Sequence, residues 1–336
     1  MDLNTGRSPG NTPNLTRRSL CAALPAVSLI PGLAKAQTEK DWMAQRPVRM
    51  VVPFPPGGGV DVVARLLAQA LGTSLGQPVV VDNKPGASGA LGTETVYNEK
   101  PDGHTIEVTS NDTHSIYPHV NRKIRYKADE FTPVAPVIQI GLILMANPRL
   151  KVRDLQEVMS LAKQRELNYA TWGVGTSSHV AMEMLRLSSG MPAMLAVAYK
   201  GSAPAIQAVL AGEVDLMMVP TNLAGGYLEK LAVIGVASPR RSPVFKSVPT
   251  LAEQGAAVDC DAWIGVVGPP RMPAAVADAI HRAVQSAIAE PGLQQRLRDK
   301  GMQPQIASRA EFASYLANEY RRWGEVVRSA KIVLDE

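Results

Sequence analysis

Several loops rich in glycine, proline and hydroxyl residues carry the residue types that could do chemistry in this 336-residue chain. In the first loop, Pro53, Pro55 and Pro56 lack backbone N–H groups, so a strand over 50–52 must end before them. The three glycines at 57–59 have no Cβ atoms, so they can take positive φ and let a ligand approach the backbone. A helical pattern starts directly after them. The loop therefore predicts unpaired N–H groups at a helix N-terminus, which favour an anion.

Asp61 lies at the start of that helix and has two interpretations. It can cap the helix or pair with Arg65 four residues later, or its side chain can contact a ligand. The loop fits neither G-x-G-x-x-G nor G-x-x-x-x-G-K-[ST], so a nucleotide ligand is not predicted.

Later loops of the same composition follow other strands, at 82–92, 110–113, 171–177 and 200–204. Open α/β sheets bind ligands at the carboxyl ends of their strands. Backbone N–H groups and hydroxyls can hold a carboxylate there without a permanent positive charge, which suits binding and release better than bond breaking. Lys200 is the cation best placed among these loops, either as a ligand contact or as a solvated surface lysine.

Patterns for catalysis and metal binding are weak. His179 follows Thr176, Ser177 and Ser178, but a nucleophile needs a base and an orienting group, and no third partner is evident. No histidine lies in H-E-x-x-H, no serine lies in G-x-S-x-G, and there is no C-x-x-C. We therefore expect no catalytic residue, no metal and no cofactor. Cys260 is expected to be a small buried residue rather than a reactive thiol.

The first 36 residues predict an export signal. Paired arginines at 17 and 18 precede an apolar stretch, 20–33, that is too short to span a membrane, and an A-x-A cleavage motif at 34–36. Cleavage would give a periplasmic protein that begins at Gln37, exported by the twin-arginine or the Sec route. An unstructured tail is the alternative.

Removal of this segment takes away four basic residues and one acidic residue, so the formal charge falls from +5 to +2. Basic residues do not cluster with aromatic ones, so no nucleic-acid partner is predicted.

Strand and helix patterns alternate along the rest of the chain, which predicts mostly parallel sheets flanked by helices. Expected strands lie at 50–52, 79–81, 105–109, 168–170, 194–199, 214–219, 231–237 and 263–267, and expected helices at 60–71, 154–164, 178–189, 205–210, 273–289 and 310–330. The apolar run at 134–146 is longer than one buried strand needs and predicts a strand crossing between two lobes. The first lobe would comprise 37–145 and 266–336, and the second 146–265.

Short motifs occur in a specific order from 47 to about 332: VPFPPGGGVD at 52–61, NKPGASG at 83–89, PDG at 101–103, FTPV at 131–134, NYA at 168–170, GVGT at 173–176 with His179, YKGSAP at 199–204, GEVD at 212–215 and VPTLAEQG at 248–255. Each is loose alone, but in this order and spacing they are specific. The chain resembles the periplasmic solute receptors of tripartite tricarboxylate transporters, the Bug-type binding proteins.

The resemblance implies an α/β, two-lobed periplasmic-binding-protein fold of type II, closing on a ligand between its lobes. The ligand would be a small carboxylate, either a di- or tricarboxylate or an aromatic acid, which a monomeric receptor delivers to the membrane subunits of its transporter. A receptor of the same fold that docks on the outer domain of a sensor kinase is the alternative, and a periplasmic enzyme is a third possibility. The implied ligand contacts are Phe54, Pro56, Gly57, Gly58, Gly59, Asp61, Ala87, Ser88, Ser110, Asn111, Thr171, Trp172, Gly173, Gly175, Thr176, Ser177, His179, Tyr199 and Asp215.

Three positions depart from the family pattern: His104, Trp172 and Ala198. Trp172 stands where a small residue is usual, so it could stack on a planar ligand or partly fill the cleft. We expect the ligand carboxylate to lie against the amides of 57–59 and those of Thr176 and Ser177.

Overall fold

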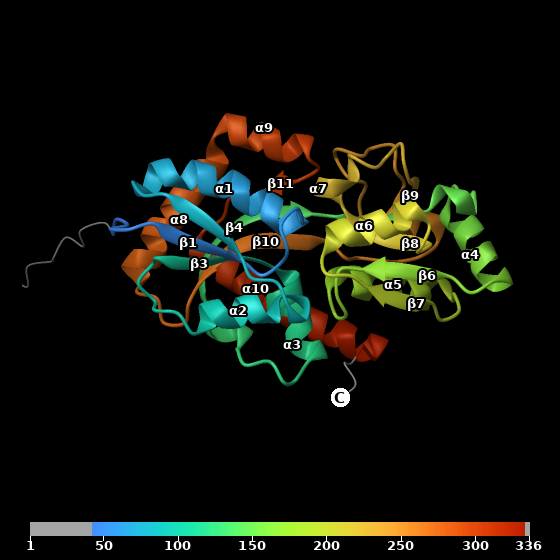
Figure 1. Ribbon diagram of the computed structural model, residues 1–336, viewed down its shortest axis with the longest axis horizontal. Coiled ribbons are helices and arrows are strands. Elements are labelled where there is room, and N and C mark those ends of the chain that lie inside the picture. Colours follow the sequence, from blue (N-terminus) through green and yellow to red (C-terminus); the bar gives the residue numbers. More distant parts are fainter. Residues whose placement is uncertain (1–41, 333–336) are drawn as a thin grey trace, which may run out of the picture. The chain divides into compact units, whose positions relative to one another are not determined.

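Two β-sheets organise the chain in a computed structural model that describes residues 42–332 (Figure 1). The predicted signal segment with its cleavage motif, and the predicted first-lobe residues 37–41 and 333–336, lie outside the described residues. The first sheet has strand order β11-β4-β10-β3-β1-β2 and the second β7-β6-β8-β5-β9. The strands are β1 (Val48–Val52), β2 (Val79–Asn83), β3 (Thr105–Ser110), β4 (Thr132–Ile140), β5 (Leu142–Ala146), β6 (Asn168–Thr171), β7 (Leu195–Ala198), β8 (Leu216–Pro220), β9 (Ala232–Val236), β10 (Ala262–Gly268) and β11 (Gln303–Pro304).

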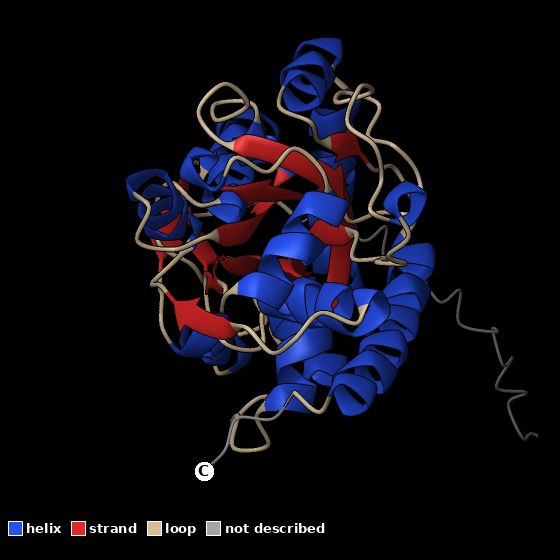
Figure 2. Ribbon diagram, turned by 90° about the vertical axis from the view of Figure 1, so that its right-hand side faces the viewer, coloured by secondary structure: helices blue, strands red, loops and turns tan. Residues whose placement is uncertain are grey.

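Helices surround the strands, as Figure 2 shows. In the first lobe α1 packs on β2 and on α8, while α8 and α10 both contact β4. In the second lobe α5 packs on β8, and α6 packs on β6 and β8. The helices are α1 (Gly59–Leu75), α2 (Ala90–Tyr97), α3 (Tyr117–Val120), α4 (Leu155–Gln164), α5 (Ser177–Ser189), α6 (Ser202–Ala211), α7 (Thr221–Ala224), α8 (Ala274–Ala289), α9 (Pro291–Asp299) and α10 (Arg309–Ala330).

The predicted strand–turn–helix unit at the start of the first lobe is confirmed. The prolines end β1 after Val52, and α1 begins at Gly59, after the glycine-rich turn. Val63, Leu67 and Leu71 recur at helical spacing and are buried, so they fix α1 on the sheet. The helix ends at Gly76, whose φ of 66° is a left-handed C-cap.

The apolar run at 134–146 forms two strands rather than one. Gly141 separates β4, in the first sheet, from β5, in the second. The chain returns between β9 and β10, which again lie in different sheets. Thus 142–145 belongs to the second sheet and 262–265 to the first, although the predicted lobe boundaries put them the other way round.

Both sheets are mixed, whereas mostly parallel sheets were predicted. β1, β2 and β3 pair in parallel, as do β6, β7 and β8. The crossing strands β4 and β5 and the returning strand β10 pair antiparallel with their neighbours. The alternation of strands and helices correctly predicted the parallel part of each sheet, and the strands that link the lobes account for the rest.

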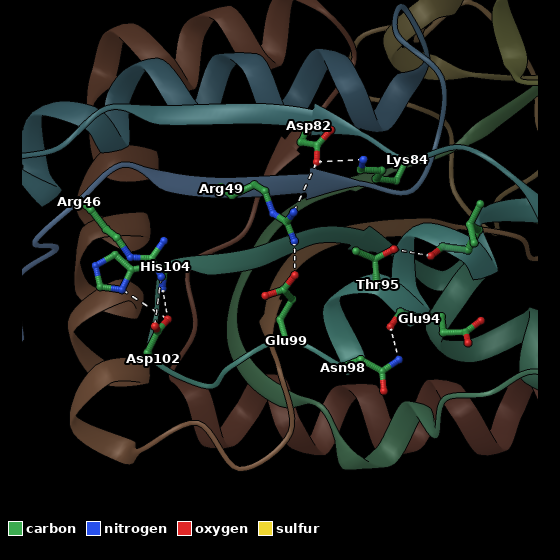
Figure 3. A network of polar contacts seen from close by, with 11 residues as sticks. Arg46, Arg49, Asp82, Lys84, Glu94, Thr95, Asn98, Glu99, Asp102 and His104 are labelled. Atoms are coloured by element: carbon green, nitrogen blue, oxygen red, sulfur yellow. Dashed lines mark hydrogen bonds and ion pairs between the residues drawn. The ribbon is translucent and has the colours of Figure 1, made fainter.

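An ion-pair network lies over β1, β2 and the turn before β3 (Figure 3). Arg49 contacts both Asp82 and Glu99, and Arg46 contacts Asp102. These side chains are partly exposed, so each pair contributes little to stability.

His104, which departs from the family pattern, is buried beside this network. Its ring packs edge-on against Trp42, and its Nε2 accepts a hydrogen bond from the Gln45 amide. Its role is therefore structural.

No helix within residues 42–332 is long and apolar enough to cross a membrane. Cys260 is fully buried, as predicted.

Candidate ligand-binding site

A cavity lies between the two lobes and encloses about 580 Å³ of empty space, including its open mouth. Both sheets contribute residues to its wall. The predicted site residues that line it are Phe54, Pro56, Gly58, Gly59, Ser110, Asn111, Trp172 and Ser177.

Asp61 shapes the first loop rather than the cavity wall. Its Oδ2 accepts the Gly57 amide and Arg65 Nε, both at 2.9 Å, and its Oδ1 accepts Asn83 Nδ2 at 2.9 Å. Burial alone would raise the pKa of Asp61, but the hydrogen bonds from Arg65, Gly57 and Asn83 bring that pKa below its usual value. The carboxylate is buried and does not line the cavity, so the interpretation as a structural group is the one supported.

The turn that Asp61 holds presents the N-terminus of α1 to the cavity. Of the three glycines only Gly57 has a positive φ, 81°, so only this residue needs the conformational freedom that was predicted for all three. Gly59 allows a close approach of the second lobe: a Cβ there would lie 3.1 Å from Asn222 Oδ1, so Asn222 would have to shift to make room for it. Asn222 Nδ2 donates to the Gly59 carbonyl at 3.0 Å, which joins the lobes at this point.

The N-terminus of α6, from the second lobe, lines the same cavity. Gly201 is its N-cap with φ 108°, and Ser202 and Ala203 open the helix. Neither α1 nor α6 has a side-chain cap. The first-turn amides of both helices lack intrahelical acceptors, so two helix N-termini from opposite lobes offer amides to the cavity. The Asp61 carboxylate also lies in the first turn of α1, where it is paired with Arg65. Lys200 is exposed and does not contribute to the wall.

The N-terminus of α5 holds a carboxylate of the protein that lies in the cavity wall itself. Asp112 Oδ1 accepts the Ser177 amide and its Oδ2 accepts Trp172 Nε1, both at 2.8 Å. The Thr176 amide donates to the Gly173 carbonyl at 3.3 Å. The prediction that a ligand carboxylate would lie against the Thr176 and Ser177 amides is therefore corrected, because both amides have internal acceptors.

Asp112 belongs to the first lobe and its two donors to the second. Burial raises the pKa of this carboxyl, while the hydrogen bonds from Trp172 and Ser177 oppose that rise. The same contact fixes the indole ring of Trp172 as part of the cavity wall. Among the described residues that line the cavity, Asp112 alone has an ionisable side chain.

Two polar side chains of the wall lack partners. Asn111 is 1% exposed, and neither its Oδ1 nor its Nδ2 has a hydrogen-bond partner within residues 42–332. Trp263 Nε1 is likewise buried and unpartnered. Buried polar groups are rarely left unpaired, so the Asn111 amide indicates a ligand or water in the cavity. The Trp263 ring packs against Phe312 and Tyr315 of α10 and also lines a second cavity beside that helix.

Several predicted contacts support the site from behind its wall. Ser88 Oγ donates to the Val174 carbonyl at 2.9 Å, which is a further link between the lobes. A Cβ on Gly173 would lie 2.6 Å from Ser88 Oγ, and one on Gly175 would lie 2.7 Å from Val120. Thr171 Oγ1 donates to the Gly173 carbonyl at 2.9 Å. These residues shape the loop at 171–177 and do not line the cavity.

His179 and Asp215 have structural partners of their own. His179 Nδ1 accepts the Gly175 amide at 3.0 Å, and burial lowers the pKa of this imidazole. Ser178 Oγ donates to Thr171 Oγ1 instead of to the histidine. Asp215 pairs with Arg165 at 2.7 Å, at the start of β8. The remaining predicted contacts outside the wall are Gly57, Ala87, Thr176 and Tyr199.

Sequence reasoning missed most of the apolar wall. These residues lie at strand ends or in the loops between sheets, and their signal is the same as that of any core strand. Asp112 is the exception, because an acidic residue so soon after the end of β3 is a recognisable signal. The wall residues not predicted as contacts are Asp112, Ile140, Leu142, Gly201, Ser202, Ala203, Pro204, Pro220, Ala262, Trp263 and Ile264, although the loops at 110–113 and 200–204 were expected to meet a ligand.

In the described part of the chain no cluster of three or more His, Cys, Asp or Glu side chains could hold a metal ion. The arrangement can bind an anion with neutral donors and enclose an apolar body beside it.

Two mixed sheets flanked by helices, with a cavity between them, define the two-lobed fold of periplasmic binding proteins. The solved structure of the periplasmic binding protein BugD is 29% identical, covers 86% of this chain and 99% of its own, and superimposes with a TM-score of 0.82. MatC from Rhodopseudomonas palustris, solved with bound malate, is 31% identical, covers 85% of this chain and 100% of its own, and has a TM-score of 0.81.

The model of the tripartite tricarboxylate transporter family receptor matches residues 63–332. Protein BugT of Bordetella pertussis is 33% identical over 325 residues, which is 94% of this chain and 98% of that protein. The chain therefore belongs to this family of receptors, of the Bug type, and its family and structural neighbours are binding proteins.

Proposed function

We propose that this chain captures a small carboxylate in the cavity between its lobes and delivers it to the membrane subunits of a tripartite tricarboxylate transporter, after export to the periplasm. The observation that carries the proposal is the meeting of the α1 and α6 N-termini, one from each lobe, at the same cavity. Each offers first-turn amides and the positive end of a helix dipole, which together favour a carboxylate.

Asn111 supports the same conclusion, because its buried amide has both a donor and an acceptor free for a ligand. The ligand's remaining contacts would be apolar, with Phe54, Leu142 and Trp263 in the wall. The malate named for MatC agrees with a carboxylate ligand. Delivery to a transporter rests on the family relationship.

A thermal-shift panel tests carboxylate capture. Small acids are compared with their neutral amides, with sugars and with amino acids, all at neutral pH. A ligand at a hundred times its dissociation constant stabilises the folded state by about 2.7 kcal/mol, which raises the melting temperature measurably. We expect acids to shift the melt and their amides not to. Amides or sugars that shift the melt as strongly as the acids would rule out binding through the two helix N-termini.

A further inference from the structure

The cavity contains a carboxylate of the protein itself. Asp112 is buried in the wall, 4% exposed, and both of its oxygens are engaged by the second lobe. Trp172 Nε1 and the Ser177 amide can only donate, so both oxygens of Asp112 accept, and these two donors favour the ionised carboxylate against the rise in its pKa that burial causes. The N-terminus of α5 stabilises that negative charge further.

We propose that Asp112 makes this site selective for monocarboxylates with an apolar body, because its own carboxylate occupies the α5 N-terminus that could otherwise receive a second carboxylate of the ligand. This inference rests on the proposed binding of a carboxylate in the cavity. It adds the substrate class, and it names the residue that sets it.

The charges in the wall support this selectivity. A monocarboxylate meets the two free helix ends, α1 and α6, and leaves the rest of the cavity uncharged. A dicarboxylate brings a second negative charge into a space that already holds Asp112, and no lysine or arginine lines the described wall to compensate for it. Two like charges in a buried site repel far more strongly than in water.

The shape of the wall supports the apolar body. Phe54, Pro220, Ala262 and Trp263 line the cavity. The indole of Trp172 cannot turn away without breaking its hydrogen bond to Asp112, so it presents a fixed flat surface. A second carboxylate placed in this part of the cavity would lose its hydration and gain no positively charged partner, since the free polar groups of the wall, such as the Asn111 amide, are neutral.

Calorimetric titration with two matched pairs of acids tests the proposal: hexanoate against adipate, and benzoate against terephthalate, at pH 8. We expect the wild type to bind each monocarboxylate at least about tenfold more tightly than its dicarboxylate. Asp112→Asn keeps the size of the side chain and removes its charge, so it should reduce this preference at least about tenfold. Glu107→Gln is the matched control, since Glu107 is equally buried in the preceding strand but does not line the cavity. It should leave the preference unchanged.

The outcomes separate this inference from the proposed function. If the wild type binds adipate as tightly as hexanoate, or if Asp112→Asn weakens both acids equally, Asp112 only joins the lobes and the selectivity is refuted while carboxylate capture stands. If no acid binds any variant, carboxylate capture itself fails and the selectivity with it. Should circular dichroism show that Asp112→Asn is unfolded, Asp112→Ser removes the same charge with a smaller side chain, and the same change in preference is required of it.

Discussion

Glu107 should make the stability of this protein fall as the pH rises, and Glu107→Gln should abolish that effect. The side chain is fully buried in β3, three positions before Ser110 of the cavity wall. Its Oε1 accepts Thr93 Oγ1 at 2.9 Å, while its Oε2 has no partner among the described residues. Burial raises the pKa of this carboxyl from 4.5 to about 7, against the opposing effect of its threonine hydrogen bonds.

The sign follows from the two protonation states. A carboxyl whose pKa is raised in the folded state holds its proton there after the unfolded chain has lost it, so the free energy of unfolding decreases between pH 4.5 and 7. Since each unit of pKa is worth about 1.4 kcal/mol, the loss approaches roughly 3 kcal/mol above pH 7. Glutamine cannot ionise and keeps the shape of the side chain, so the variant escapes this loss.

Urea denaturation of wild type and Glu107→Gln at pH 5, 6.5 and 8 measures the effect. The free energy of unfolding of the variant, relative to that of the wild type, should increase by roughly 2–3 kcal/mol between pH 5 and 8. His114, whose pKa burial lowers to about 3, makes the folded state less stable in acid, but it is present in both proteins and cancels in the difference. If wild type and variant keep the same difference in stability at all three pH values, Glu107 does not ionise as described.

Three further predictions concern the α1 unit and the N-terminus. Gly58→Val should fold, since φ is −77° at this position, but its methyl groups would meet Ser202 Oγ, which lies 3.4 Å from a Cβ placed there. Ligand binding should therefore weaken about tenfold or more. Full affinity in this variant would remove the loop from the site. Gly72→Ala changes a residue inside the same helix, where only the Gln77 carbonyl oxygen lies near the added Cβ. This variant should keep full affinity and raise the free energy of unfolding by about 0.5–1 kcal/mol. A loss of stability would show that the helix is more crowded than described. N-terminal sequencing of exported protein should find Gln37 first, and an intact Met1 in the periplasm would exclude cleavage.

The local structure of this chain was largely predictable because its signals are local. Prolines and glycines punctuate the chain between β1 and α1, and the apolar side chains of α1 repeat at helical spacing. The break at Gly141 was missed, because the apolar run continues on both sides of it and only the pairing with two different sheets reveals the change.

The site was predictable in part. The loops that meet at the cavity were identified, since loops after parallel strands share one edge of a sheet. The proposed position of the anion was not predictable, because it depends on which helix ends remain free. Asp112 occupies the end of α5, and only the approach of the two lobes brings Asp112 to Trp172 and Ser177.

A crystal structure of the complex with an acid that shifts the melt would test the central claim most directly. The ligand carboxylate should lie within hydrogen-bond distance of the first-turn amides of α1, at Gly59 and Val60, and of α6, at Ser202 and Ala203, with its apolar body beside Trp172. A carboxylate bound elsewhere in the cavity, or a ligand outside it, would contradict capture by the two helix N-termini.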